Sequence, residues 1–169
     1  MSIVPIPIST MEPLLRLLQQ DAVASREDLA RQLNLPLEEI NRRISEMEKS
    51  GVIRGYQAIV DRERLDKNNV TAFIEVRITP ERGGGFDRIA ERIAKFDQVA
   101  GCYLISGGYD LLVVVEGASL REVASFVSEK LSTLEPVIST ATHFRLKTYK
   151  ENGALLVGDA AEERLAVSP

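Results

Sequence analysis

The stretch SREDLARQLNLPLEEINRRISEMEKSGVIRGY, residues 25–56, decides the fold of the first half of the chain. It predicts two short helices around a tight turn, followed by a strand. Ser25 can cap the first helix, because its hydroxyl can accept a backbone N–H that the first turn leaves unpaired. Pro36 ends that helix, since it has no N–H and restricts the residue before it to extended angles. Gly51 ends the second helix, because glycine tolerates the left-handed angles found there.

The second of these helices, residues 37–50, has an apolar face. Leu37, Ile40, Ile44 and Met47 recur at the spacing of one helical stripe. Two helices that cross over a short turn, with a polar side of the second exposed, are typical of a helix-turn-helix. Helical hairpins that do not bind DNA have the same spacing, so this pattern alone leaves both interpretations open.

The polar side of residues 37–50 holds the candidate DNA-binding side chains. At about 100° per residue, Glu38, Arg42, Ser45 and Lys49 lie opposite the apolar stripe, with Glu46 beside them. Arg42, Ser45 and Lys49 can contact bases or phosphates in the major groove. The alternative is that Glu38–Arg42 and Arg42–Glu46 form ion pairs on a solvated helix. The candidate DNA-binding residues are Asn41, Arg42, Arg43, Ser45, Lys49 and Arg54.

Composition limits the other functions that the chain can have. Its 169 residues are enough for one medium or two small domains, and 44% are hydrophobic, as in ordinary globular chains. A single cysteine and a single histidine give little material for a disulfide, a metal site or a cofactor site, and we expect none of these. No apolar run approaches the roughly 20 residues of a membrane span. We therefore expect a cytoplasmic protein that does not associate with membranes.

The charge balance does not favour nucleic acid. The net charge is −4, and residues 1–66 contain nine basic and eleven acidic side chains. DNA-binding domains are often strongly basic, so any DNA contact must depend on the local placement of cations.

Residues 70–149 alternate between strand and helix patterns. Residues 70–78, 99–106 and 111–116 have the character of strands. Phe86, Ile89, Ile93 and Phe96 are spaced as on a helix. Ser119 and Glu122 form a capping box that opens a second helix. Its predicted apolar face consists of Leu120, Val123, Val127, Leu131 and Leu134. The predicted last strand, residues 137–149, alternates through Ile138, Thr140, Thr142, Phe144 and Leu146. This β-α-β-β-α-β order predicts a ferredoxin-like antiparallel sheet with helices on one face.

The chain resembles the Lrp/AsnC family of transcription regulators. The segments that carry the resemblance are Leu17–Ala22, Asp28–Ala30, Ile40–Ile44 and Gly51–Tyr56, and it continues through residue 149. It implies an α+β chain, with a winged helix-turn-helix at residues 9–60 and a linker at 61–69. A ferredoxin-like domain of RAM or ACT type follows at 70–149, and then a tail at 150–169. It also implies double-stranded DNA and an amino-acid effector as partners, and self-assembly to a homodimer and an octamer.

The same resemblance points to an effector site and to one departure from the family. Gly107, Gly108, Tyr109 and Asp110 match the family's effector loop, and exposed glycine N–H groups together with Asp110 can hold both ends of a zwitterion. The alternative is a simple hairpin turn. Weaker candidates for effector binding are Thr140 and Thr142. The family usually has a Ser-Pro pair at the start of the recognition helix, where this chain has Leu37, Glu38 and Glu39.

Two other functions remain as alternatives. Two carboxylates at the start of the helix would face phosphates, which favours an amino-acid sensor or assembly protein that has lost DNA binding. A related branch with this two-domain plan decarboxylates tetrapyrroles such as sirohaem, but that chemistry needs basic groups around propionates. His143, the only histidine, is expected on the sheet surface, and Cys102 is expected to be a small buried hydrophobe.

Overall fold

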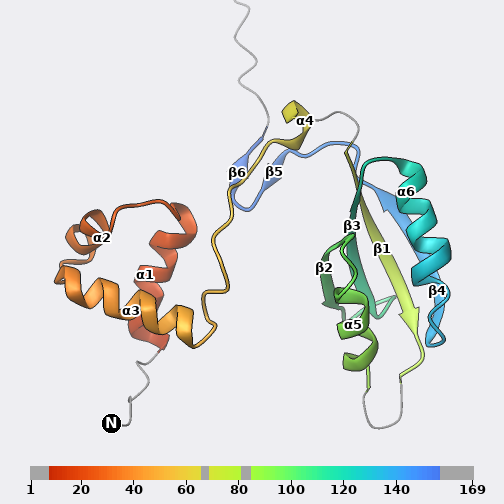
Figure 1. The fold of residues 1–169 in the computed structure, drawn as a ribbon, viewed down its shortest axis with the longest axis horizontal. Coiled ribbons are helices and arrows are strands. Elements are labelled where there is room, and N and C mark those ends of the chain that lie inside the picture. Colours follow the sequence, from red (N-terminus) through yellow and green to blue (C-terminus); the bar gives the residue numbers. More distant parts are fainter. Residues whose placement is uncertain (1–7, 66–68, 81–84, 157–169) are drawn as a thin grey trace, which may run out of the picture. The chain divides into compact units, whose positions relative to one another are not determined.

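The computed structural model describes residues 8–65, 69–80 and 85–156, and it divides into two compact units (Figure 1). The first unit runs to residue 59 and includes residues 152–154, and the second contains residues 60–151 and those from 155 onward. In these ranges no helix has both the length and the apolar character needed to span a bilayer. A helical unit followed by a helix-covered sheet confirms the predicted α+β fold class.

Three helices form the first unit: α1 (Ile8–Gln20), α2 (Arg26–Leu33) and α3 (Leu37–Lys49). Their apolar stripes meet in one core, because each helix buries the side chains that recur every three or four residues. Leu29, Ile40 and Met47 have no exposed surface, and Ile44 is 1% exposed. The predicted apolar face of the second helix is therefore confirmed, except that Leu37 at its start is 40% exposed.

The ends of α2 and α3 follow from local chemistry. The Ser25 hydroxyl accepts the backbone N–H of Asp28 at 3.1 Å, as predicted. After α2, Asn34 takes left-handed angles with φ 51°, which asparagine tolerates better than most residues. Gly51 has φ 74° directly after α3, in agreement with its predicted role. Asn34 thus begins the turn between the two helices, while Ser25 and Gly51 define the outer ends of the helical pair.

The strand predicted for residues 52–60 is wrong for the described chain. These residues are extended, but no neighbouring described segment pairs with them as a strand, and extended backbone needs such a partner to form a ladder. Instead the Ile53 N–H donates to the Met47 carbonyl at 3.0 Å, and the Tyr56 hydroxyl bonds to Glu48 Oε1 at 3.0 Å. The segment is thus attached to α3 at its start and exposes Ile59 and Val60 at its end.

The second unit has the predicted element order. It contains α4 (Arg62–Leu65), β1 (Val70–Ile78), α5 (Asp87–Ala94), β2 (Val99–Leu104), β3 (Leu111–Gly117), α6 (Leu120–Ser125), the π-helix η1 (Phe126–Leu131) and β4 (Val137–Phe144). The strands form one antiparallel sheet in the order β2-β3-β1-β4 (Figure 1). The short helix α4 lies in the segment that the sequence predicts as a polar linker.

The sheet has a covered face and an open face. Alternate residues of β1 and β3, such as Ile74 and Val113, are fully buried in a core shared with Ile89 and Ile93 of α5 and Val123 of α6. Side chains between them point to the other face, because successive strand residues alternate. That face holds the half-buried apolar side chains Phe73, Leu112 and Val114 and the exposed Tyr103, together with a His143–Glu75 pair at 3.3 Å.

The second helical segment has most of its predicted apolar face: Val123, Leu131 and Leu134 are buried and Val127 is half-buried against the same core. The predicted cap by Ser119 is present, because the Glu122 N–H donates to Ser119 Oγ at 3.2 Å. The Glu122 carboxylate reaches back one residue farther than in a capping box and accepts the Ala118 N–H at 2.7 Å. Leu120, however, is 58% exposed, whereas Phe126 is 3% exposed. Leu120 is the first residue of α6, and Phe126 lies three residues after the buried Val123, at ordinary helical spacing. The π-helix begins only at Phe126, and the next fully buried side chain, Leu131, is five residues farther on.

The end of the chain also differs from the prediction. The last strand ends at Phe144 rather than at residue 149, and Leu146 is 95% exposed. Residues expected to be a tail form a hairpin instead, β5 (Lys150–Glu151) with β6 (Ala154–Leu155). Its turn is Asn152-Gly153, both with positive φ, the pair that a two-residue hairpin prefers. Residues 157–169 of the expected tail lie outside the described residues.

Candidate nucleic-acid interface and ligand loop

The outward side of α3 carries the side chains that the sequence singled out for DNA. Asn41, Arg42 and Lys49 are exposed and Ser45 is half-buried. Arg43 is turned toward the flank, with 18% of its side chain exposed. Arg54 is exposed and comes from the extended segment after α3, where its guanidinium lies close to Gly51. The helix brings four of the six candidates onto one surface, with Arg43 and Arg54 at its margins.

Two glutamates of the same helix bind Arg42 on three nitrogens. Glu39 accepts hydrogen bonds from Nε at 2.9 Å and from Nη2 at 2.8 Å, and Glu46 accepts one from Nη1 at 2.8 Å. Arg43 Nε donates to Glu39 Oε1 at 2.6 Å. These bonds are possible because residues three and four apart are neighbours on a helix surface. The Arg42–Glu46 pair was predicted, but the second carboxylate is that of Glu39, not that of Glu38.

The two arginines change the titration of Glu39. Hydrogen bonds from Arg42 first, and then from Arg43, lower the pKa of Glu39 from 4.5 to about 2. The same bond raises the pKa of the Arg42 guanidinium. Glu39 and Arg42 therefore stay ionised at neutral pH. The formal charges of the two arginines, Glu39 and Glu46 sum to zero. Glu39 is the residue near this surface that sequence reasoning missed, and its spacing to both arginines is the signal that could have found it.

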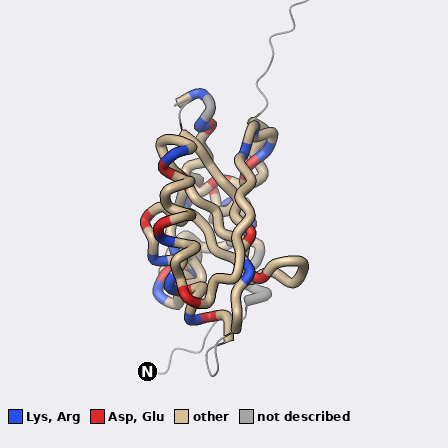
Figure 2. The backbone as a smooth tube through the Cα atoms, turned by 90° about the vertical axis from the view of Figure 1, so that its right-hand side faces the viewer, with Lys and Arg blue, Asp and Glu red and all other residues tan. Residues whose placement is uncertain are grey.

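Three other charged side chains on or near α3 are not part of this ion-pair cluster. Within the described ranges, Glu38, Lys49 and Arg54 form no ion pair, so they remain available to a ligand. Along the described part of the backbone, basic and acidic positions are interspersed (Figure 2). The outward side of α3 therefore offers isolated cations and not a broad basic patch.

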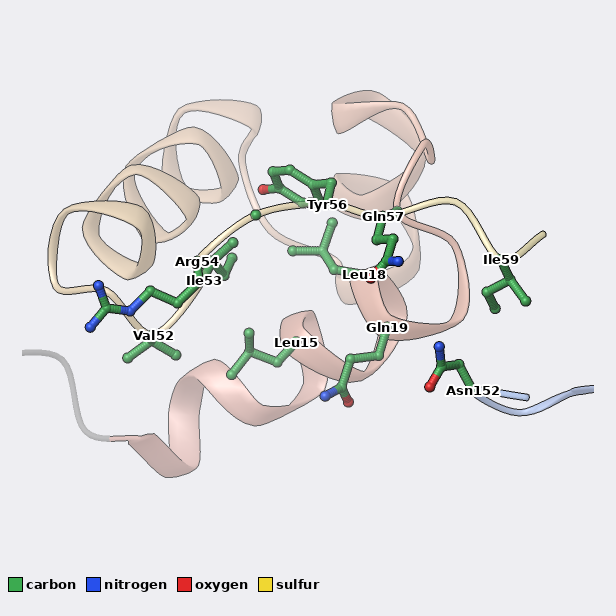
Figure 3. Close-up of a pocket in the computed structure, with 12 residues that line it drawn as sticks. Leu15, Leu18, Gln19, Val52, Ile53, Arg54, Tyr56, Gln57, Ile59 and Asn152 are labelled. Carbon is green, nitrogen blue, oxygen red and sulfur yellow. The ribbon is translucent and has the colours of Figure 1, made fainter. Parts of the chain in front are cut away.

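A groove of about 310 Å³ lies on another side of the first unit. Leu15, Leu18 and Gln19 of α1 lie along one side, and residues 52–57 and Ile59 of the extended segment line the other (Figure 3). Asn152 closes one end. None of the predicted site residues except Arg54 borders this groove, so it is separate from the outward side of α3.

The predicted effector loop lies between β2 and β3. Gly107 and Gly108 are exposed, and Tyr109 and Asp110 are half-buried. Asp110 has a structural role in addition to any ligand contact, because its Oδ2 accepts the Ile78 N–H at 2.8 Å and its own N–H donates to the Val76 carbonyl at 3.0 Å. Ile78 lies where the pairing of β1 with β4 shifts register. Among the described residues, no group bonds to Asp110 Oδ1, which leaves one carboxylate oxygen for a ligand.

The two threonines lie farther from this loop. Thr140 is opposite Val76 in β1 and Thr142 is opposite Ile74, on the edge strand β4. Leu111, next to Asp110, is opposite Val76 from the other side. Two strand spacings put Thr140 about 10 Å from Leu111. The structure therefore brings Asp110 and Thr140 to the same end of the sheet, with β1 between them, and places Thr142 one pleat away.

The remaining candidate chemistry is limited. No group of three metal-binding side chains is found in the ranges that the structure describes. Cys102 is half-buried on β2, and burial raises the pKa of its thiol. His143 is mostly exposed on the open face of the sheet, as expected.

Comparison with known proteins adds two family matches. Residues 14–54 match the model described as winged helix-turn-helix DNA-binding, and residues 71–155 match the Lrp/AsnC ligand binding domain. The HTH-type transcriptional regulator YugG of Bacillus subtilis is 45% identical over 157 residues, which cover 92% of this chain and 95% of that protein.

Solved structures share the fold. An AsnC family transcriptional regulator from Agrobacterium tumefaciens is 28% identical with a TM-score of 0.65, and the match covers 83% of this chain and 91% of that one. A transcriptional regulator from Neisseria meningitidis, solved as a complex with L-Met, is 24% identical with a TM-score of 0.65, over 80% and 86% of the two chains.

Proposed function

The chain belongs to the Lrp/AsnC family of transcription regulators, and from this premise we propose that α3 binds the DNA major groove while the loop at residues 107–110 binds an amino-acid effector. The observation that carries the DNA proposal is the outward side of α3, which presents Asn41, Arg42, Ser45 and Lys49 after a turn that begins at Asn34. A helix exposed in this way can enter a groove that is wide enough for it.

The roles of the individual residues follow from their chemistry. Asn41 and Arg42 have the donors and acceptors that read adenine and guanine edges. Lys49 and Arg54 have unpaired positive charges in the described chain, suited to phosphates on either side of the groove. Arg43 supports the surface from the flank. The binding strength supplied by so few cations is modest, so we expect it to depend on two copies of α3 acting together.

The DNA proposal is tested with the double variant R42A/K49A. Fluorescence anisotropy on DNA from the gene's own upstream region should show at least a tenfold loss of affinity and a shallower dependence on salt. The matched control is R92A/K95A, which removes one arginine and one lysine from exposed positions at the end of α5. Equal affinities for the wild type and R42A/K49A would refute the assignment of α3.

The effector proposal rests on the chemistry of the loop. Gly107 and Gly108 leave backbone N–H groups exposed for a carboxylate, and Asp110 Oδ1 can accept from an ammonium group. The L-Met complex of the Neisseria relative makes methionine a reasonable first ligand. Isothermal titration with L-methionine and a panel of other amino acids tests the proposal. No heat with any of them, for wild-type protein that binds DNA, would exclude an amino-acid effector.

We also propose that the chain forms a homodimer and then an octamer. The open face of the sheet, with Phe73, Leu112 and Val114, and the exposed Ile59 and Val60 of the extended segment are apolar surfaces that a second copy can cover. A DNA-bound regulator of this kind would act in the cytoplasm and without catalysis. Light scattering gives the number of subunits, and a monomer at micromolar concentration would contradict the assembly.

One observation favours a second function. Glu39 and Glu46 bind the arginine that would contact DNA, and Glu38 adds a carboxylate at the start of α3. An amino-acid sensor that no longer binds specific DNA would have such a surface. It predicts effector binding and assembly together with equal, weak affinity for any DNA sequence.

A further inference from the structure

We infer that Glu39 determines DNA specificity: by binding both arginines of α3, it weakens their attraction to phosphates while orienting Arg42 for a base edge. This inference rests on the proposed DNA binding by α3. It gives a role to the Glu39 carboxylate, which would otherwise only repel the phosphates of DNA. Glu39 is a positioning residue in this account, since it acts through Arg42 and Arg43.

In this cluster the charge of Arg42 is offset, but part of its hydrogen-bonding capacity remains. A guanidinium has five N–H groups, and the carboxylates of Glu39 and Glu46 accept three of those of Arg42. One N–H on Nη1 and one on Nη2 remain. Arg42 therefore keeps two donors of the kind that bind guanine O6 and N7, while its positive charge is offset by two carboxylates within 3 Å.

Phosphates and bases respond differently to this arrangement. Phosphate binding depends mainly on net positive charge and on the release of counterions, and the cluster of Glu39, Arg42, Arg43 and Glu46 supplies none. Base reading depends on the direction of donors, and Glu39 fixes that direction by binding Nε and Nη2 of the same guanidinium. The side-chain entropy of Arg42 is thus already lost before DNA arrives.

Glu39 is suited to this role by its placement. One of its oxygens accepts from both Arg42 and Arg43, and only 25% of its side chain is exposed. Its carboxylate stays ionised at any pH near neutral, because its pKa is about 2. Glu38, its neighbour in the sequence, has the same charge at the same end of α3 but makes no ion pair within the described ranges.

The pair E39Q and E38Q tests the inference, since both remove one negative charge from the first turn of α3. Anisotropy titrations use the upstream DNA and a scrambled DNA of equal composition, between about 50 and 250 mM salt. For E39Q we expect a roughly five- to tenfold gain in affinity for scrambled DNA near 0.1 M salt and a salt slope steeper by about one, as for one added phosphate contact. Its affinity for upstream DNA should not rise, so the ratio of the two affinities should fall at least fivefold.

The control variants define the outcomes that would overturn the inference. E38Q should move both affinities together and leave their ratio within about twofold. R42K keeps the charge but loses the planar fork, and should lose the preference for upstream DNA while it still binds scrambled DNA. If E39Q and E38Q had the same ratio of upstream to scrambled affinity, Glu39 would act only through its charge and not by orienting Arg42. If the wild-type protein bound both DNAs equally and R42A/K49A did not change its affinity, the proposed DNA function would fail as well. This result distinguishes a failure of the DNA function from a failure of the role of Glu39 alone.

Discussion

Replacement of Asp110 by alanine separates its structural role from its proposed role in ligand binding. Asp110 Oδ2 accepts the N–H of Ile78, and the bond is 2.8 Å long. Ile78 is 3% exposed and lies at the register shift between β1 and β4, so water does not easily replace the lost acceptor. A hydrogen bond to a charged acceptor is worth roughly 1.5–3 kcal/mol, and an unsatisfied buried donor costs a similar amount.

We therefore expect D110A to destabilise the end of the sheet around Ile78 by about 2 kcal/mol. This corresponds to a roughly 30-fold increase in the opening equilibrium at that amide, because each 1.4 kcal/mol is a factor of ten. Amide hydrogen exchange measured by NMR reports it directly, as faster exchange at Ile78. D110N keeps one acceptor oxygen and should show a smaller increase, and D97A, which removes an exposed carboxylate of the same unit, should show none.

Equal exchange rates of the Ile78 amide in D110A and in the wild type would refute the structural role of Asp110. If D110A lost effector binding while Ile78 exchange stayed the same, Asp110 would contribute to effector binding but not to the stability of the sheet. Loss of both protection and effector binding would be ambiguous, and D110N resolves it: its amide can preserve the bond to Ile78 but cannot pair with an ammonium as a carboxylate does.

Three further results are expected. S25A removes the cap of α2 and should lower the free energy of unfolding of the first unit by about 1 kcal/mol in urea titrations; an unchanged midpoint would mean that Ser25 does not hold the helix start. The pKa of Glu39 is lowered, so stabilisation from its ionised form is complete above pH 4.5 and is lost as the pH falls through about 2. Carbon-13 NMR should place its titration midpoint near pH 2, and a midpoint near 4.5 would show that the two arginines do not bind it. G153A forces alanine to φ 88° and should cost about 1–2 kcal/mol of hairpin stability, seen as faster exchange at Leu156, whereas unchanged exchange would mean that the turn relaxes.

Much of the fold could be predicted because local signals and buried stripes agree. Ser25, Gly51 and the 3–4 spacing of Ile40, Ile44 and Met47 each specify the same helices, and the structure has them. The same holds for Val70–Ile78, where alternation and length match a buried strand. Agreement across several levels of the sequence is what makes such a segment predictable.

The errors have physical causes that pattern reading cannot detect. Residues 52–60 have strand composition, but a strand needs a hydrogen-bonding neighbour, which depends on the rest of the fold. Leu120 was misjudged because it is the first residue of α6, and the buried side chains of that segment begin one turn later, at Val123. The hairpin at Asn152-Gly153 was different, since the dipeptide signal was present in the sequence and was overlooked.

The candidate site was only partly accessible from the sequence. The outward position of Arg42, Ser45 and Lys49 follows from helical geometry alone. Helical geometry does not show which carboxylate binds Arg42. Glu38 at four residues and Glu39 at three are both in range, and the choice depends on rotamers. The bond from Ile78 to Asp110 joins residues 32 apart in sequence, and no local pattern could indicate it.

The most direct test of the account is the binding of wild-type protein to DNA from its own upstream region and to scrambled DNA, measured by fluorescence anisotropy across a salt series. We predict tighter binding to the upstream DNA and a steep loss of affinity with salt, because cations beside α3 contact phosphates while Asn41 and Arg42 read bases. Equal and weak binding to both DNAs, with little dependence on salt, would contradict it and favour a sensor that does not recognise specific DNA.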